Sequence, residues 1–182
     1  MGEQRDAIDD DLAAWLLAQP VFFVASAPLS ATGHVNCSPK GLDAFRVLGP
    51  RRVAYVDIAG SGAETVAHLR ENGRIVFMFC AFSGPPRIVR LHGVGKAVLP
   101  SDKDWAALHA QLPAHDGTRS IIVADITRVS SSCGFGVPTF EQFSPRSALP
   151  AWVKRKGEDG VREYQRRNNR QSIDGLPAIE ID

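Results

Sequence analysis

The chain has 182 residues, of which 44% are hydrophobic and 23% are charged, as is ordinary for one globular domain with a sizeable core. Its 21 basic and 20 acidic side chains leave a net charge of +1, which argues against the broad basic surface of a general nucleic-acid-binding protein. No apolar run is long enough to span a membrane as a helix. We therefore expect that the protein binds no nucleic acid and does not associate with a membrane.

The N-terminal residues lack the basic-then-apolar pattern of a secretory signal. The three cysteines, Cys37, Cys80 and Cys133, are odd in number and far apart, which disfavours a disulfide framework or a Cys-x-x-Cys metal site. The sequence therefore predicts a cytoplasmic protein whose thiols are reduced and mostly buried.

The first part of the chain predicts one helix followed by strands. Acidic residues begin a short helix over Asp9–Ala18, and Pro20 ends it. Apolar runs then predict a strand over Val21–Ala27 with a hairpin partner at His34–Ser38, and another strand over Arg52–Ile58.

A Ser-x-x-Glu pattern at Ser61–Glu64 is typical of a helix capping box, with Ser61 as the cap. The helix that follows should end at Gly73, a residue type that favours helix C-termini. Arg74–Phe82 is apolar at nearly every position, which predicts a strand buried on both faces.

Arg87–Leu99 predicts a long strand in which Gly93 and Gly95 indicate a bulge or sharp bend, as closing a small barrel requires. A helix capped by Ser101 should then extend to Leu112. A last strand, rich in Ile and Val, follows over Arg119–Ser131.

Five or six strands with few helices point to a mainly β (α+β) fold, an antiparallel barrel with peripheral helices. We assign residues 1–148 to the barrel domain. Residues 149–182 become charged and helical, and we expect them to form a C-terminal extension packed on the same domain.

Two segments could hold an anion. Ser38-Pro39-Lys40-Gly41 could present a hydroxyl and a cation to a phosphate, although a solvated surface lysine is an equally simple interpretation. Gly60-Ser61-Gly62 precedes a helix, whose free N–H groups and dipole favour an anion, unless Ser61 only caps the helix. A phosphate there would be repelled by Glu64 unless that carboxylate points away or pairs with Lys40.

A third segment carries Arg87 and Arg90. Period-two alternation places them on opposite faces of a strand, so both can meet one ligand only if a bulge intervenes. A salt-bridged barrel arginine is as good an interpretation. The five histidines show no metal-ligand spacing, no Gly-x-Ser-x-Gly elbow is present, and no residue stands out as a general base. We expect no metal site.

Together, the Ser38-x-Lys40 strand exit, the Gly-Ser61 helix start and the Arg87-Ile-Val-Arg90-Leu-x-Gly93 strand resemble the FMN-binding barrel of the pyridoxamine 5′-phosphate oxidase-like superfamily. The resemblance covers about Val21–Leu99. It implies a split β-barrel with Greek-key character that forms a homodimer, with FMN in the cleft between subunits.

By position, the resemblance implies that nine residues bind the cofactor. Ser38, Lys40, Ser61 and Thr65 would hold the phosphate and ribityl chain, Tyr55, Val56 and Asp57 would border the isoalloxazine ring, and Arg87 and Arg90 match the family's arginine strand. Glu64 departs from the family, because several relatives have a basic residue there.

The resemblance implies a flavoprotein oxidoreductase with an unidentified small-molecule substrate or electron donor. It does not indicate a dedicated pyridoxamine 5′-phosphate oxidase, because the Arg-Leu-x-x-Arg form of that enzyme's C-terminal tail is missing. The segment Asn168–Pro177 could fold over the flavin, with Ser172 and Asp174 as polar contacts. Two alternatives remain open, a deazaflavin-binding reductase of the same fold and a non-catalytic flavin- or haem-binding module.

Overall fold

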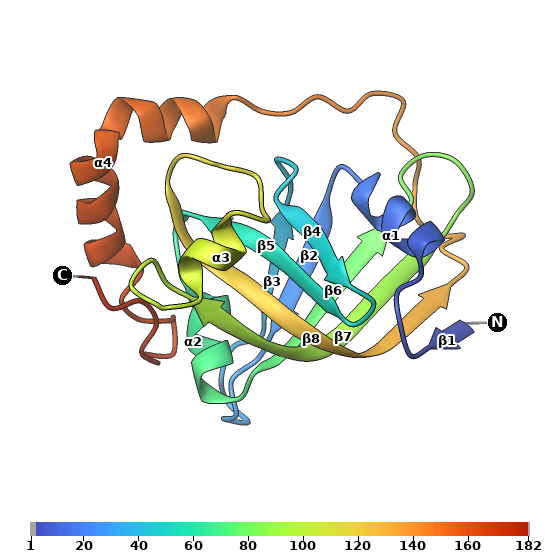
Figure 1. Cartoon of the computed structure of the whole chain (residues 1–182), viewed down its shortest axis with the longest axis horizontal. Helices are drawn as coiled ribbons and strands as arrows, with labels where there is room; N and C mark the ends of the chain where they lie inside the picture. The colour runs from blue at the N-terminus through green and yellow to red at the C-terminus, as the bar shows by residue number, and fades with distance from the viewer. Residues whose placement is uncertain (1–2, 182) are drawn as a thin grey trace.

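Eight antiparallel strands form the centre of the structure, a computed structural model that describes residues 3–181 (Figure 1). Their order in the sheet is β3-β2-β6-β7-β8-β5-β4, and β1 pairs with β8. In chain order they are β1 (Glu3–Arg5), β2 (Phe22–Ser26), β3 (Asn36–Lys40), β4 (Phe45–Gly49), β5 (Arg52–Ile58), β6 (Arg74–Cys80), β7 (Ile88–Val98) and β8 (Thr118–Ser132).

The sheet coils into a barrel that hydrogen bonds do not close. Its two edge strands, β3 and β4, do not pair with each other, whereas β5 crosses to pair with β8. Aromatic side chains fill the interior of the barrel. The ring centroids of Phe22 and Phe45 are 5.2 Å apart, and those of Phe22 and Phe79 are 5.5 Å apart. The mainly β split barrel with Greek-key character and outer helices is therefore confirmed.

The bend in β7 lies at its glycines, as predicted. The register with β8 shifts between His92 and Gly93. A Cβ atom at Gly93 would collide with the backbone carbonyl of Asp125, so only glycine permits this close approach. Figure 1 shows β7 and β8 curving together across the barrel.

Four helices lie outside the barrel in the described part of the chain: α1 (Asp10–Leu17), α2 (Glu64–Glu71), α3 (Trp105–His109) and α4 (Ala148–Asn168). The first of them follows the prediction closely. The Leu12 amide donates to the Asp9 carboxylate over 2.8 Å and so caps the helix, while Leu12 and Leu16 are buried in the core.

The predicted caps of the next two helices were wrong. Helix α2 begins at Glu64, with Ala63 in the cap position and no side-chain cap, so Ser61 lies outside it. Helix α3 has only five residues and does not start at Ser101. The Asp102 carboxylate instead accepts the amide of Leu99 at 2.8 Å, which makes a turn where the sequence suggested a helix.

The prediction that β6 is buried on both faces was also wrong for the single chain. Ile75, Phe77 and Phe79 point into the core, but Val76 and Met78 on the outward face are only half-buried. The predicted burial of the thiols fails as well, because Cys37 and Cys133 are exposed and only Cys80 is buried; all three are free.

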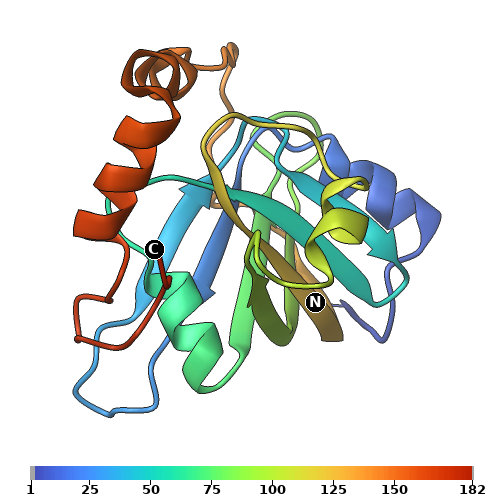
Figure 2. The ribbon, with the colours of Figure 1, turned by 60° about the vertical axis from the view of Figure 1, so that its left-hand side comes forward.

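The C-terminal extension wraps the barrel. Helix α4 is broken at Gly157, whose φ of 66° and ψ of 173° are not helical, and its two halves run in different directions in Figures 1 and 2. Beyond the helix, Ala178 and Ile179 are buried in the main core, and the Arg70 guanidinium donates to the carbonyl of Ala178 at 2.6 Å. The extension therefore packs on the barrel.

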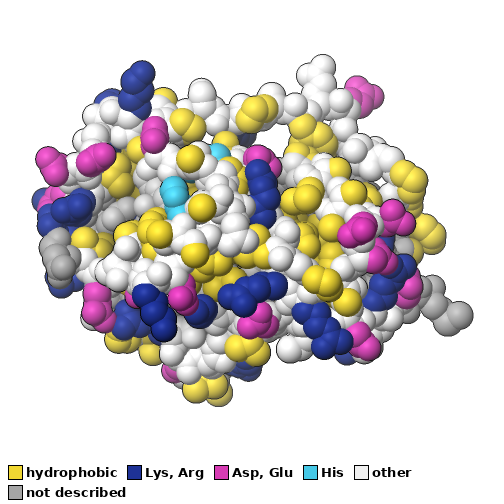
Figure 3. All heavy atoms as spheres, viewed as in Figure 1, with side chains coloured by type: hydrophobic (Ala, Val, Ile, Leu, Met, Phe, Trp, Pro, Cys, Tyr) yellow, Lys and Arg dark blue, Asp and Glu magenta, His cyan; other side chains and the backbone are white. Residues whose placement is uncertain are grey.

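Charges are mixed on the surface, in keeping with the balanced composition. On the face shown in Figure 3, Lys and Arg side chains lie among Asp and Glu side chains and form no continuous basic area. Within residues 3–181, no helix combines the length and the apolar character needed to cross a membrane.

Candidate functional site

A polar cavity of about 340 Å³ lies where β3, the end of β5 and the start of α2 meet. Strand β3 contributes alternate residues because successive side chains of a strand point to opposite faces. The lining residues are Asn36, Ser38, Lys40, Asp57, Ile58, Gly60, Ser61, Gly62, Glu64, Thr65 and Arg119. Five of the nine residues predicted to bind a cofactor, Ser38, Lys40, Asp57, Ser61 and Thr65, are thus brought together.

Asp57 is the centre of the charge network in this cavity. One carboxylate oxygen accepts from Nε of Arg119 at 2.8 Å and from the Ser120 hydroxyl at 3.1 Å, and the other accepts from Nζ of Lys40 at 3.2 Å. Burial by itself raises the pKa of Asp57, but the nearby Arg119 and Lys40 outweigh it and hold the pKa at about 2. Asp57 is therefore an anion at neutral pH.

Arg119 is a functional candidate that the sequence analysis missed. Its side chain is only 5% exposed, and its Nη1 is buried without a hydrogen-bond partner among the described residues. Such a donor is costly to leave unpaired, so it indicates a place for an acceptor from outside the chain. The one sequence signal was a charged residue at the start of an Ile- and Val-rich strand.

A row of uncharged polar side chains borders the same space. Nδ2 of Asn36 donates to the Thr65 hydroxyl at 3.1 Å, and the Ser38 hydroxyl donates to the Asn36 amide oxygen at 3.0 Å. These bonds link β3 to the first turn of α2 and fix the orientation of all three side chains. Asn36 is a second residue that sequence reasoning did not select.

The C-terminal extension reaches this cavity at the start of α2. The Glu64 carboxylate accepts the backbone amide of Ile173 at 3.0 Å, and Nδ2 of Asn169 donates to the Gly60 carbonyl at 3.0 Å. Glu64 therefore neither closes a capping box nor pairs with Lys40. Its carboxylate is bound by Ile173, which belongs to the segment Asn168–Pro177 that we expected could fold over the site.

An exposed ion pair fastens the same segment to the barrel. The Asp174 carboxylate accepts from the backbone amide of His34 at 2.8 Å and contacts Nδ1 of the same residue at 2.7 Å. The hydrogen bond with Asp174 raises the pKa of His34. Ser172 does not line the cavity. Its hydroxyl oxygen accepts hydrogen bonds from the backbone amides of Asp174 and Leu176 within its own turn.

The remaining predicted site residues lie elsewhere in the single chain. Tyr55 is fully buried beneath Lys40, whose Nζ is 5.5 Å from the ring centroid, and burial raises the pKa of Tyr55. Val56 points to the other face of β5, into a cluster that packs against α3. Neither lines the cavity.

Both predicted arginines are also outside the cavity. The Arg87 guanidinium lies over the ring of Trp15, 4.9 Å from its centroid, just before β7. Arg90 donates to the Ser132 hydroxyl at 3.3 Å on the outward face of the sheet, where it stands opposite Met78.

Solved structures with a similar fold include the following two. A pyridoxamine 5′-phosphate oxidase described as putative, from Lactobacillus delbrueckii, is 14% identical and has a TM-score of 0.52 over 69% of this chain and 94% of its own. HupZ of Group A Streptococcus is 17% identical, with a TM-score of 0.52 over 67% of this chain and 91% of its own. At these identities the likeness concerns the fold alone.

Sequence comparison gives the family. Residues 8–133 match the family model described as pyridoxamine 5′-phosphate oxidase. The pyridoxamine 5′-phosphate oxidase family protein ustO of Aspergillus flavus is 41% identical over 193 residues, covering 96% of this chain and 76% of the relative. The chain belongs to the pyridoxamine 5′-phosphate oxidase family.

Proposed function

We propose that this protein is an FMN-binding flavoprotein oxidoreductase that holds the cofactor phosphate in the cavity between β3, β5 and α2. One observation carries the proposal: in a chain of this family, the cationic side chains of Lys40 and Arg119 line the same small polar cavity. Cations in a part-buried site form strong, charge-assisted hydrogen bonds with phosphate oxygens.

The start of α2 supplies further donors. Among residues 3–181, no side chain caps this helix, so the N–H groups of its first turn remain available, and the helix dipole favours an anion there. Ser61 does not cap the helix and lines the cavity together with Gly60 and Gly62. Because these two glycines have no side chains, a ligand can approach the backbone there. The residues present therefore fit a phosphate group.

When bound, FMN would supply the redox chemistry, by accepting a hydride or electrons on its ring. The contribution of this chain is then to bind and orient the cofactor. Asp57 stays ionised at neutral pH and holds Arg119 and Lys40 in place at the cavity.

The proposal includes a homodimer. The outward face of β2, β6 and β7 carries the half-buried apolar residues Phe23, Val76 and Met78. A second copy of the chain packed on this face would cover them and would also meet Arg90, which lies on it. The free cysteines fit a reducing compartment, and a cytoplasmic location is part of the same proposal.

Reconstitution with FMN tests the proposal directly. Added protein should quench flavin fluorescence, and FMN should raise the melting temperature, because a ligand that binds only the folded state stabilises it. Riboflavin, which lacks the phosphate, is the matched control ligand and should bind more weakly. Equal affinity for both flavins would contradict the proposed phosphate site. Absence of binding by either flavin would contradict the proposed function.

We further propose that the substrate is not pyridoxamine 5′-phosphate. The C-terminal tail lacks the Arg-Leu-x-x-Arg form of that enzyme, and Arg166 and Arg167 of α4 are engaged with Glu163 within their own helix. FMN-loaded protein given pyridoxamine 5′-phosphate and oxygen should form the aldehyde with an efficiency below the ordinary enzyme range, which begins at about 10⁴ M⁻¹s⁻¹. Turnover above that value would contradict this assignment.

A further inference from the structure

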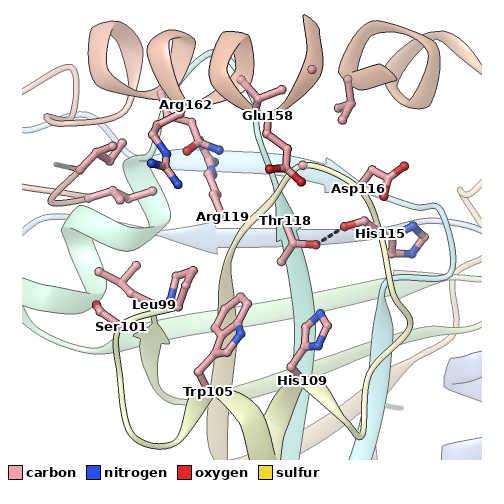
Figure 4. A pocket seen from close by; sticks show the side chains of 18 of the residues that line it. Leu99, Ser101, Trp105, His109, His115, Asp116, Thr118, Arg119, Glu158 and Arg162 are labelled. Carbon is pink, nitrogen blue, oxygen red and sulfur yellow. Dashed lines mark hydrogen bonds between the residues drawn. The ribbon is translucent and has the colours of Figure 1, made fainter. Parts of the chain in front are cut away.

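Arg119 also lines a second and larger cavity, with a volume of about 820 Å³, that lies beneath α4 (Figure 4). Its walls are α3, the loop from α3 to β8, the start of β8, α4 and the C-terminal residues 179–181. Arg119 is the one lining residue that it shares with the cavity proposed for the flavin phosphate. Half of the lining lies beyond residue 133, where the family match ends.

One wall carries a stacked pair of aromatic rings. The rings of Trp105 and His109, on successive turns of α3, are stacked with their centroids 5.3 Å apart and their planes 15° apart. Figure 4 shows both rings pointing from α3 into the cavity. Both residues are only half-buried, so a planar ring could pack against them at the cost of little rearrangement.

Two cations face the same space from the opposite side. The buried Nη1 of Arg119 has no acceptor among the described residues, although Nε of the same side chain is bound to Asp57. Arg162 of α4 also lines the cavity and makes no hydrogen bond or ion pair with any residue from 3 to 181. In Figure 4 the side chain of Arg119 extends toward α4 and that of Arg162 extends from α4 toward it. Guanidinium groups that converge in this way are matched by an anion.

The other end of the cavity has the opposite charge. Glu158 and Asp116 line it and lie away from Arg162 in Figure 4. Beside them, Nε2 of His115 is a second buried nitrogen without a hydrogen-bond partner among the described residues. A ligand that is negative at both ends would be repelled here, so the lining selects a molecule with a single acidic end.

We propose that this cavity binds a planar aromatic molecule with one anionic group, its ring on Trp105 and His109 and its anion at Arg119 and Arg162. The site shares Arg119 with the flavin cavity, but its occupation does not require a flavin. A void with no ligand would leave the buried Nη1 of Arg119 without an acceptor among residues 3–181, which proteins generally avoid.

Calorimetric titration of the full chain, free of flavin, with 2-naphthoate tests the site. We expect saturable binding of one molecule per chain. The matched control ligand is 2-naphthamide, which has the same ring and no charge, and it should bind about tenfold more weakly, as expected when a charge-assisted hydrogen bond is lost. Equal affinities, or no saturable binding of 2-naphthoate, would overturn the proposal.

Two variants locate the bound molecule. Arg162→Gln should weaken 2-naphthoate binding about tenfold, whereas Arg155→Gln, on the exposed side of the same helix and outside every cavity described, should leave it unchanged. Trp105→Leu, which keeps an apolar side chain but removes the flat ring, should weaken binding about five- to tenfold. Unaltered melting temperatures would show that the variants fold. If a folded Arg162→Gln or Trp105→Leu variant binds as tightly as the parent chain, the cavity is not the site.

Discussion

Asp57 contributes both to the stability of the fold and to the charge of the candidate site. Its carboxylate is almost fully buried and balances two cations, Arg119 and Lys40, that also line the cavity. Removing the negative charge would leave the buried guanidinium without a counter-ion, which costs far more than losing an exposed ion pair. The cavity therefore depends on Asp57 for its shape as well as for its charge.

We predict that Asp57→Asn lowers the free energy of unfolding by about 3–5 kcal/mol at neutral pH, the usual cost of breaking a buried ion pair. The control is Asp125→Asn, which removes an exposed carboxylate 3.8 Å from Arg52 and should cost about 1 kcal/mol or less. Urea unfolding measures both. Similar losses in the two variants would mean that the buried network contributes no special stability.

The same carboxylate predicts how stability depends on pH. Its pKa is about 2 in the folded chain, below the ordinary value of 3.8, so the folded state favours the ionised form. The stabilisation is complete above the unfolded pKa and is lost as the pH falls from about 4 toward 2, by roughly 2 kcal/mol. Urea midpoints measured over that range should fall more steeply for the parent chain than for Asp57→Asn.

Replacing Lys40 tests its proposed contact with the FMN phosphate. Lys40→Ala should weaken FMN binding by about 1.5–3 kcal/mol, the scale of a charge-assisted hydrogen bond. Asp57 keeps its bond to Arg119 in this variant, so the chain should still fold. Lys96→Ala removes a lysine paired with Asp104 on the surface and is the control. Fluorescence titration of FMN compares them, and unchanged affinity in Lys40→Ala would return Lys40 to a purely structural role.

At the scale of elements, local pattern predicted strands better than helix starts. Strand β5 has the predicted bounds, because its apolar run and flanking residues act locally. The start of α2 could not be predicted from Ser61 and Glu64 alone. Glu64 is bound by the amide of Ile173, more than a hundred residues further along the chain, and no local pattern contains that contact.

The break in α4 also has a local cause that can be tested. Gly157 has φ 66° and ψ 173°, a conformation that is open almost only to glycine, so Gly157→Ala should cost about 1–3 kcal/mol. Gly160→Ala, three residues along the same helix, is the control. A Cβ atom there would meet only the flexible Lys156 side chain, and alanine should stabilise the helix by about 0.5–1 kcal/mol. Thermal unfolding of both variants would show opposite shifts, and a stabilised Gly157→Ala would mean that the break is not held by the backbone.

For the whole molecule, the barrel could be predicted from the sequence, and the family resemblance, which rests on strand order and short motifs, indicated five residues that line the candidate site. The association of the C-terminal extension with the site could not be predicted. Asn169 contacts Gly60 and Asp174 contacts His34 across more than a hundred residues of sequence, which no local pattern contains. The large cavity under α4 depends on the same long-range packing, and no local pattern marks Arg162 as one of its lining residues.

The assembly of two chains is the last prediction. Sedimentation at micromolar concentration should give a mass near twice the 19.7 kDa of one chain. Met78→Lys would place an ammonium group in the middle of the outward apolar face of β6, where a second copy would have to bury it, and should yield monomers. Leu29→Lys adds the same charge at a residue that is 63% exposed in the loop after β2, and it should stay dimeric. Because Met78 faces outward, its replacement should spare the fold, which circular dichroism can check. A parent chain that sediments as a monomer with flavin bound would rule out a cofactor cleft shared between subunits.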